Sequence, residues 1–483
     1  MNLLNPFKQQ DLTKGKPYQK ILVFAFPILI SSLLGNAFSL INSLVLKFSI
    51  GGDAVTSISV TSSISSLLFN FAYGSSSGFA ILSSNAIGEK NYDKVKKNLI
   101  NSIFLSIIIS VFITSIGLLL LDILLELLNV QEIFLLDAKN YFMVILASFI
   151  FLLMNNLLGN FLRAIGDSFF ALLFSFLTTV LNISFAFLLS YVIKLGVIGV
   201  GLATLFANLI TTFITLFYIF KRYKYLRFNF NEFKFDKEIV ISQLKMGMPL
   251  GLQWSILFIG SFIQSSQVNR FGVINIDGIN SSMASKASAC YTSFEGYITM
   301  PLSVSASALL SFIGQNYGAK KYNRIKKGIK DCFILDVIYC VLVLIIVTPL
   351  IKYVPYIFLT KDEVNHEVYG EMIKFYCSRY LYAVVPSLIL QGTLQLSRST
   401  LQGIKKPLIP FFSGIGELIA RATICFALPY LINFNNPLSN ESYIGICFST
   451  PLAWLISVII MGGATVKYIY LNKDLKTNDD DIA

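Results

Sequence analysis

The sequence reads Gly88-Glu89-Lys90-Asn91-Tyr92-Asp93-Lys94-Val95-Lys96-Lys97, and 230 residues later it reads Gly318-Ala319-Lys320-Lys321-Tyr322-Asn323-Arg324-Ile325-Lys326-Lys327. Five of the ten positions are identical, and each stretch directly follows a long apolar run. Two similar loops at equivalent places in the chain indicate an internal duplication. The two copies of the duplicated unit are therefore expected to share one fold.

Apolar segments dominate the chain around these two loops. Hydrophobic residues make up 55% of the 483 positions and charged residues 13%, which is about half the charged share of a soluble protein. Ten runs without charge are long enough to cross a bilayer, for which roughly 20 apolar residues are needed. They are 21–46, 54–88, 98–121, 140–162, 168–193, 195–220, 246–269, 296–319, 380–397 and 442–466, and two further runs, 332–351 and 407–433, contain charges. This pattern predicts an all-α membrane protein with twelve transmembrane helices and argues against a soluble enzyme.

The duplication divides these helices into two sets of six. We expect a lobe at 21–220 and a second at 245–466, joined by a basic, aromatic linker at 221–244. Tails at 1–20 and 467–483 complete the chain. Two halves that begin and end on the same side of the membrane form parallel repeats, related by a pseudo-two-fold axis along the membrane normal. The first run is expected to remain as a membrane span, because it is too long for a signal peptide.

Positive charge is distributed unevenly between the predicted loops. With the amino terminus inside, 28 of the 38 Lys and Arg residues lie in inner segments. Such a bias orients membrane proteins, so we expect both termini in the cytoplasm. The net charge of +12 is explained in this way without nucleic-acid binding.

Residues for enzymatic or metal chemistry are scarce. The six cysteines have no C-x-x-C spacing, and His366 is the single histidine, so no metal site and no disulfide framework are predicted. Phosphate-binding and nucleophile motifs are missing as well. We expect a protein that is not an enzyme and needs no cofactor.

Several phrases in both halves resemble the multidrug and toxic compound extrusion (MATE) family, and within it the prokaryotic DinF-like or related branches. These phrases are Phe26-Pro27-Ile28-Leu29, the loop 88–97, Leu162-Arg163-Ala164-Ile165-Gly166-Asp167-Ser168, Gly247-Met248-Pro249-Leu250-Gly251-Leu252-Gln253 and Ile313-Gly314-Gln315-Asn316-Tyr317-Gly318-Ala319 with Tyr322 and Arg324. The resemblance implies a V-shaped pair of six-helix bundles and efflux of amphiphilic or cationic compounds. It also implies that a proton or sodium gradient drives the efflux.

The second half holds the few charges that lie inside predicted spans. A charge in the hydrocarbon layer costs at least a few kcal/mol, so each is a candidate functional residue. Glu295 precedes Pro301 and matches a Glu often seen in the family's eighth helix; it is a candidate for binding a proton, a coupling ion or cargo. Glu417 and Arg421 are four residues apart, within ion-pair reach on one helix face, and form either a structural pair or a coupling site.

The first half departs from the family pattern. Asn42 stands where many prokaryotic members have an Asp, and Ala186 replaces a second Asp four residues after Asn182. An amide does not exchange a proton near neutral pH. Three outcomes follow: coupling through Glu295 and Glu417, sodium held by neutral oxygens of Asn42 and Asn182, or movement of cargo without ion drive.

Amides on the seventh span are candidates for the substrate cleft. Gln253 and Gln264 are eleven residues apart, about three turns along one face, where they could contact cargo or pack helices. We therefore expect a monomeric multidrug exporter of the bacterial inner membrane that uses alternating access and antiport. The alternative is a flippase or facilitator for an amphiphilic molecule without ion coupling. The expected partners are small amphiphilic or cationic substrates and membrane lipids.

Overall fold

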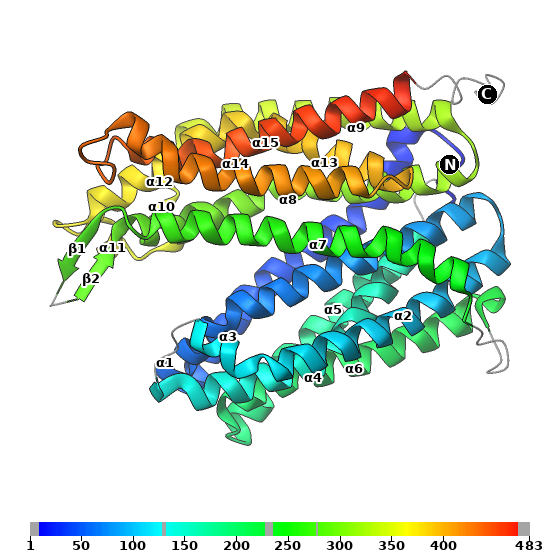
Figure 1. Ribbon diagram of the computed structural model, residues 1–483, viewed down its shortest axis with the longest axis horizontal. Helices are drawn as coiled ribbons and strands as arrows, with labels where there is room; N and C mark the ends of the chain where they lie inside the picture. Colours follow the sequence, from blue (N-terminus) through cyan, green and yellow to red (C-terminus); the bar gives the residue numbers. More distant parts are fainter. Residues whose placement is uncertain (1–8, 128–131, 228–234, 277–278, 472–483) are drawn as a thin grey trace. The chain divides into compact units, whose positions relative to one another are not determined.

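A computed structural model describes residues 9–127, 132–227, 235–276 and 279–471 of the chain. Within these ranges it describes only the backbone of residues 36–63, 124, 127, 132–134 and 362. The fold consists of helices with one short antiparallel ribbon (Figure 1). Contacts between residues divide the chain into two compact units. Unit 1 contains 1–255, 310–321 and 403–407, and unit 2 contains 256–309, 322–402 and 408–483.

The helices of unit 1 come mainly from the first half of the chain. They are α1 (Pro17–Gly88), α2 (Tyr92–Leu119), α3 (Leu121–Leu127), α4 (Glu132–Ala164), α5 (Ser168–Ala186), the π-helix η1 (Phe187–Val192), α6 (Gly196–Arg222), the 3-10 turn η2 (Lys224–Leu226) and the start of α7 (Lys237–Val268). α4 packs against α1, α2 and α6, and buried aromatic side chains such as Phe79, Phe149 and Phe161 fill the core. The unit is therefore an all-helical bundle.

Unit 2 begins inside α7 and is helical apart from the ribbon β1 (Val273–Ile276) and β2 (Ile279–Ser282), which the sequence did not predict. Its helices are α8 (Met283–Gly318), α9 (Tyr322–Val347), η4 (Thr348–Tyr353), α10 (Pro355–Phe358), α11 (Lys361–Val364), α12 (Gly370–Val384), η5 (Val385–Ser387), α13 (Leu388–Gly403), α14 (Leu408–Ile432), α15 (Tyr443–Thr465) and η6 (Val466–Tyr470). α15 packs against α14 and α12. The last segment of α8 belongs to unit 1.

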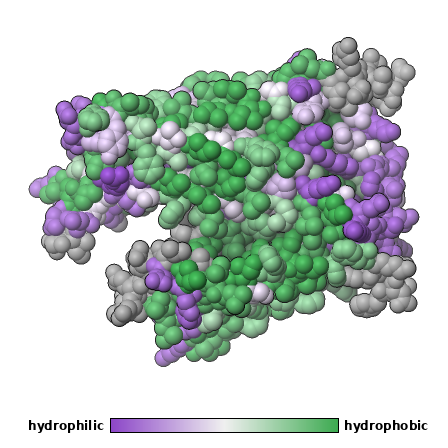
Figure 2. All heavy atoms as spheres, in the orientation of Figure 1, coloured by the Kyte–Doolittle hydropathy of each residue, from purple (hydrophilic) through white to green (hydrophobic). Residues whose placement is uncertain are grey.

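Ten helices in the described residues are long and apolar enough to cross a membrane. The two other predicted spans are not separate helices of that kind: 54–88 lies within α1, and 380–397 runs across α12, η5 and α13. Large apolar side chains such as Phe112, Phe217 and Ile459 are more than 60% exposed. Figure 2 shows hydrophobic residues along the helices and hydrophilic residues toward their ends. Lipid contact explains this surface, so the chain is a multi-pass membrane protein.

Buried polar groups fix the junction between α4 and α5. Asp167 accepts a hydrogen bond from the backbone N–H of Phe170 at 3.3 Å and so caps α5. The hydroxyls of Tyr218 and Tyr223 also donate to this carboxylate, at 2.9 Å and 2.5 Å. Burial and then the charge of Asp167 raise the pKa of Tyr223, so its hydroxyl stays a donor at every physiological pH. This junction therefore holds the end of α6 against the start of α5.

Candidate functional site

Glu417 and Arg421 form the ion pair that their spacing on α14 predicted. Nη2 of Arg421 lies 3.1 Å from Oε1 of Glu417, and the two residues are 8% and 5% exposed. The other carboxylate oxygen, Oε2, accepts a hydrogen bond from Ser457 of α15 at 3.3 Å. Each charge offsets the desolvation of the other, which makes the pair tolerable inside the bundle.

A second arginine completes this ion pair. Nη2 of Arg398 on α13 lies 3.8 Å from Oε2 of Glu417, and Arg398 is 4% exposed. Arg398 directly follows the predicted span 380–397 and so counts among the 28 positive residues of the expected inner segments, but α13 continues to Gly403 and Arg398 is buried in it. Glu417 is thus a carboxylate between two guanidinium groups. A positive residue near a loop looks like a topology signal, which is why the sequence did not reveal it.

Hydrogen bonds extend from this ion pair to Gln264 of α7. Nη1 of Arg421 donates to Oε1 of Gln264 at 3.1 Å, and the hydroxyl of Thr450 on α15 donates to the same oxygen at 3.0 Å. Gln264 is buried, and its side chain joins three helices of unit 2. This residue was predicted as a cleft-lining amide, and the structure makes it part of the same cluster as Glu417 and Arg421.

The next members of the cluster lead to Glu295. Tyr380 of α12 lies 3.3 Å from the Thr450 hydroxyl and donates a hydrogen bond of 2.9 Å to Oε2 of Glu295 on α8. Its ring stacks on Tyr291 with centroids 3.8 Å apart, which fixes the position of its hydroxyl. Glu295 is partly exposed, whereas Tyr380 is 2% exposed. Sequence reasoning missed Tyr380 and Thr450, because uncharged hydroxyls are common in every span.

From Arg398, hydrogen bonds continue to a second residue of α8. Arg398 donates to Oε1 of Gln395 at 3.3 Å, and Gln395 donates to the hydroxyl of Ser303 at 3.5 Å. We call this connected set the polar chain. It consists of Glu295, Tyr380, Thr450, Gln264, Arg421, Glu417, Arg398, Gln395 and Ser303. With both glutamates ionised, its two acids and two arginines sum to zero charge.

Asp336 is a further buried acid of unit 2, and its hydrogen bond is made with a residue outside the polar chain. Asp336 of α9 is 4% exposed and accepts a hydrogen bond of 2.9 Å from Ser305 of α8. Oδ2 of Asp336 has no hydrogen-bond partner among the described residues. Asp336 is therefore a buried carboxyl group with one oxygen that is open to a further hydrogen bond.

The predicted residues of unit 1 whose side chains the structure describes form no comparable charged cluster. Asn182 donates to the hydroxyl of Thr204 on α6 at 3.1 Å, and Ala186 is buried where α5 passes into η1. Asn42 lies in α1, outside the residues whose side chains are described. Gln253 is fully buried, and neither of its amide atoms has a hydrogen-bond partner in the described part of the chain. Gln253 belongs to unit 1 and Gln264 to unit 2, since the division falls within α7.

A small polar cavity of about 70 Å³ lies between α4, α5 and α6 of unit 1. Amide and hydroxyl groups line it together with Arg163, whose Nη1 donates to Asn160 at 2.9 Å. Asn155 also lines it and donates to Thr178 and to Asn208 at 3.1 Å and 3.0 Å. A space of this size has room for ordered water. The cavity in unit 1 is thus lined by neutral oxygens and by the positively charged side chain of Arg163.

Comparison with known proteins places these features in context. A family model described as MatE matches residues 27–188 and 253–426. The chain is 24% identical to a Bacillus subtilis protein named "Probable multidrug resistance protein YoeA" over 472 residues, which cover 95% of each chain. It is 26% identical to the B. subtilis "Probable multidrug resistance protein YpnP" over 66% of this chain and 69% of that protein.

Solved structures show the same fold. One, described as the outward-facing conformation of a multidrug resistance MATE family transporter, is similar with a TM-score of 0.82 at 20% identity, over 98% of this chain and all of the other. A transporter from Pyrococcus furiosus, described as having a binding pocket of reverse polarity, is similar with a TM-score of 0.81 at 20% identity, over 95% of this chain and 99% of the other. The predicted all-helical membrane fold of two bundles is confirmed.

Proposed function

Since this chain belongs to the MatE family, we propose that it is a secondary exporter of small amphiphilic or cationic compounds. We propose antiport by alternating access, with both termini in the cytoplasm and the chain acting as a monomer in the bacterial inner membrane. The names of the relatives, which describe them as probable multidrug resistance proteins, support export of several small molecules. No cofactor enters this proposal. The observation that carries it is the polar chain, which links two membrane-embedded carboxylates through hydrogen bonds across unit 2.

The coupling ion in this proposal is the proton. Glu417 lies between Arg398 and Arg421, and these two fixed positive charges repel a sodium ion. Glu295 receives a hydrogen bond from a neutral hydroxyl and has no ion pair within 4.0 Å among the described residues. It is the partly exposed end of the polar chain, where a proton or a cationic group of the cargo can arrive.

The net charge of the polar chain couples the binding of protons to the binding of a cationic cargo. When both glutamates are ionised the polar chain is neutral, and a cationic compound can bind beside Glu295. When a proton neutralises Glu295, the two arginines leave the chain with a net positive charge, which repels a cation. Proton and cargo therefore exclude each other, which is the requirement for exchange. Asn182 and the amides of unit 1 contribute neutral contacts to cargo in this scheme.

The test is efflux of a fluorescent cationic dye from proteoliposomes under an imposed proton gradient or an imposed sodium gradient. The variants are Glu295→Gln and Glu417→Gln, and the matched control is Glu371→Gln, whose side chain is 89% exposed on α12. We expect the proton gradient to drive export by the wild type and the control but not by either variant. If neither gradient drives export and both variants behave as the wild type does, antiport is wrong and a flippase or facilitator replaces it.

A further inference from the structure

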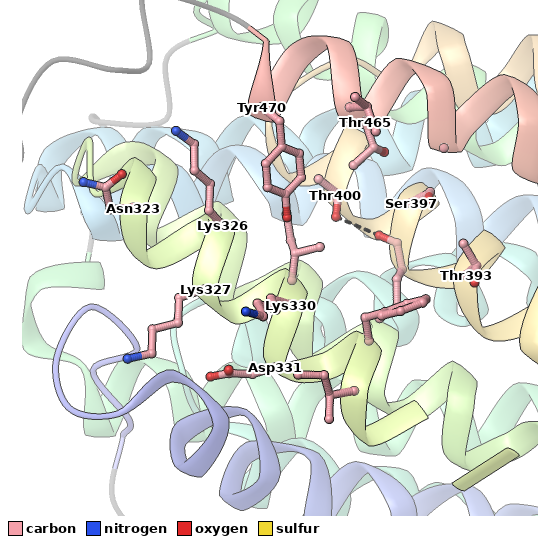
Figure 3. Close-up of a pocket in the computed structure, with 16 residues that line it drawn as sticks. Asn323, Lys326, Lys327, Lys330, Asp331, Thr393, Ser397, Thr400, Thr465 and Tyr470 are labelled. Carbon is pink, nitrogen blue, oxygen red and sulfur yellow. Dashed lines mark hydrogen bonds between the residues drawn. The ribbon is translucent and has the colours of Figure 1, made fainter. Parts of the chain in front are cut away.

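A groove with a cavity volume of about 980 Å³ opens between α9, α13 and the end of the chain formed by α15 and η6 (Figure 3). All of its lining residues belong to unit 2, and none is part of the polar chain. Lysines from the first turns of α9 line one part of it, and apolar side chains such as Phe333, Ile334 and Leu396 line another. The groove thus combines positive charge with apolar surface.

Within the described ranges, no acid forms an ion pair with the lysines of the groove. Lys326, Lys327 and Lys330 line it, and none of their ammonium groups has a carboxylate within 4.0 Å among the described residues. Asp331 is the one acid among the lining residues, so the groove carries a net charge of about +2. Lys326 and Lys330 are four residues apart and lie on one helix face. A ligand with a phosphate group would supply the missing negative charge.

The groove runs along α9 from charged to apolar residues. Its lining on α9 extends over twelve residues, from Asn323 to Ile334, or roughly 16 Å of helix. The lysines lie in the first part of this length, and Phe333 and Ile334 lie at its end. In Figure 3, Asn323 and Lys326 lie at one end of the view and Thr393 at the other. Charge at one end and apolar lining beyond it suit a headgroup followed by an acyl chain.

One buried hydroxyl of the groove lacks a partner. Thr465, at the end of α15, is 7% exposed and lines the groove, and its Oγ1 has no hydrogen-bond partner among the described residues. Hydroxyls in a helix usually donate to a backbone carbonyl, as Thr400 does here to Leu396 at 2.8 Å. An unpaired buried hydroxyl costs free energy unless a ligand accepts its hydrogen bond. The ester oxygens of a glycerolipid are acceptors of this kind.

We propose that this groove is a binding site for an anionic phospholipid. The phosphate lies at Lys326, Lys327 and Lys330, the glycerol esters lie near Thr465, and an acyl chain runs along Phe333 and Ile334. The lipid comes from the leaflet that meets the lysine-rich ends of the helices. This site is separate from the coupling residues, so it can be tested without reference to export.

Native mass spectrometry tests the proposal by counting phosphatidylglycerol and phosphatidylcholine of equal acyl chains that stay bound to the full chain. The test variant replaces Lys326, Lys327 and Lys330 with Gln. The control replaces Lys90, Lys96 and Lys97, which lie in the repeat-related loop and on α2, with Gln. Since each lysine near a lipid surface contributes about fivefold to binding, we expect the test variant to lose at least about tenfold in phosphatidylglycerol affinity. The control is expected to stay within about twofold.

A second variant tests the contribution of the acyl chain to binding separately from that of the lysine charges. Ile334→Trp fills the apolar part of the groove and keeps all three lysines, and we expect it to lower retention of phosphatidylglycerol by about fivefold. Free glycerol phosphate is expected not to displace the lipid. Equal retention of the two lipids, an equal loss in the control variant, or displacement by glycerol phosphate would each overturn the proposal. Thermal unfolding of every variant shows that a loss is not caused by misfolding.

Discussion

Gly88 and Gly318, which are 230 residues apart, make the same contact from opposite repeats. A Cβ added to Gly88 would overlap the backbone carbonyl of Gln315, and a Cβ added to Gly318 would overlap that of Asn85. Asn85 and Gln315 are themselves 230 residues apart, so the contact is reciprocal, as in an interface with two-fold symmetry. All four residues belong to unit 1. The duplication found in the sequence therefore corresponds to a symmetric contact between α1 and α8.

The first prediction concerns this contact. Gly318→Ala places a methyl group against a backbone carbonyl that cannot rotate away, so α1 and α8 must separate. We expect a loss of about 1–3 kcal/mol in the stability of the contact. A cysteine introduced at Ser84, which is buried and donates to the carbonyl of Ser311 at 3.2 Å, reports the separation through faster reaction with a maleimide. The six native cysteines are buried and give a low background.

The control for this substitution is Gly463→Ala on α15, because an added Cβ there meets no atom within 4 Å. Alanine in a helix interior is favoured over glycine by roughly 0.5–1 kcal/mol, so the control should keep or raise stability. Equal labelling of the cysteine in Gly318→Ala and in the parent protein would show that the glycine contact does not hold the two helices together.

The second prediction concerns the segment before α1, which joins parts of unit 1 that are distant in sequence. Gln10 donates its backbone N–H to the carbonyl of Gly166 at 2.9 Å. Leu12 is fully buried, and its N–H donates to Oε1 of Gln315 at 3.0 Å. Gln315→Ala removes this acceptor, which costs about 1–3 kcal/mol for a buried N–H. We expect trypsin to cleave after the exposed Lys14 about tenfold faster than in the wild type.

Gln19→Ala is the control for this cleavage, because Gln19 lies nearby on the exposed side and bonds to Tyr18. If trypsin cleaves the Gln315→Ala and Gln19→Ala variants at the same rate, the segment is not held by Gln315. If the cleavage after Lys14 rises only in Gln315→Ala, the segment is docked as the hydrogen bonds indicate. Gel electrophoresis of timed samples measures both rates.

The third prediction is that Glu417→Gln destabilises the fold. The substitution leaves Arg398 and Arg421 buried without their carboxylate, and removal of one partner from a buried ion pair costs about 3–5 kcal/mol. The melting temperature in detergent should fall clearly, whereas Glu371→Gln should leave it unchanged. A double variant, Arg398→Gln with Glu417→Gln, removes one of the two unpaired charges and should recover part of the loss. A double variant less stable than Glu417→Gln alone would contradict this explanation.

Much of the fold follows from patterns that are local in the sequence. Runs without charge predicted the spans because hydrocarbon excludes ions whatever the tertiary fold. Spacing of four residues predicted the pair of Glu417 and Arg421, since both lie on one helix. The runs 21–46 and 54–88 both lie in α1, which is helical from Pro17 to Gly88. Leu12, just before α1, and Gly88, at its end, both contact Gln315, so the chain reverses direction within α1, as two spans require.

The polar chain could be predicted only in part. Glu295, Gln264, Glu417 and Arg421 were identified because each is a polar residue within an apolar span. Tyr380 was not, because its role depends on a contact with a residue 85 positions away. Distances of this kind are set by helix packing, for which one sequence carries no pattern. The groove at Lys326 was missed for a related reason, since its lysines were assigned to topology.

The last prediction separates a positioning role of Tyr380 from a structural one. Tyr380→Phe keeps the ring that stacks on Tyr291 and removes the hydroxyl that donates to Glu295 and contacts Thr450. A hydrogen bond to a charged group contributes about 1.5–3 kcal/mol, so dye export driven by the proton gradient should slow about 10- to 100-fold. The melting temperature should change little, and Tyr382→Phe on the same helix, where the side chain is half exposed, should transport as the wild type does.

A thermodynamic cycle decides how Tyr380 acts. If its hydroxyl works through Glu295, Tyr380→Phe should have no further effect on export in the Glu295→Gln background, because residues in one hydrogen-bond network are not additive. If the two substitutions multiply, the hydroxyl acts on export by another route, and Glu295 is not joined functionally to Thr450 and the rest of the polar chain. The measurement is the initial rate of dye efflux for the wild type, both single variants and the double variant at one imposed gradient.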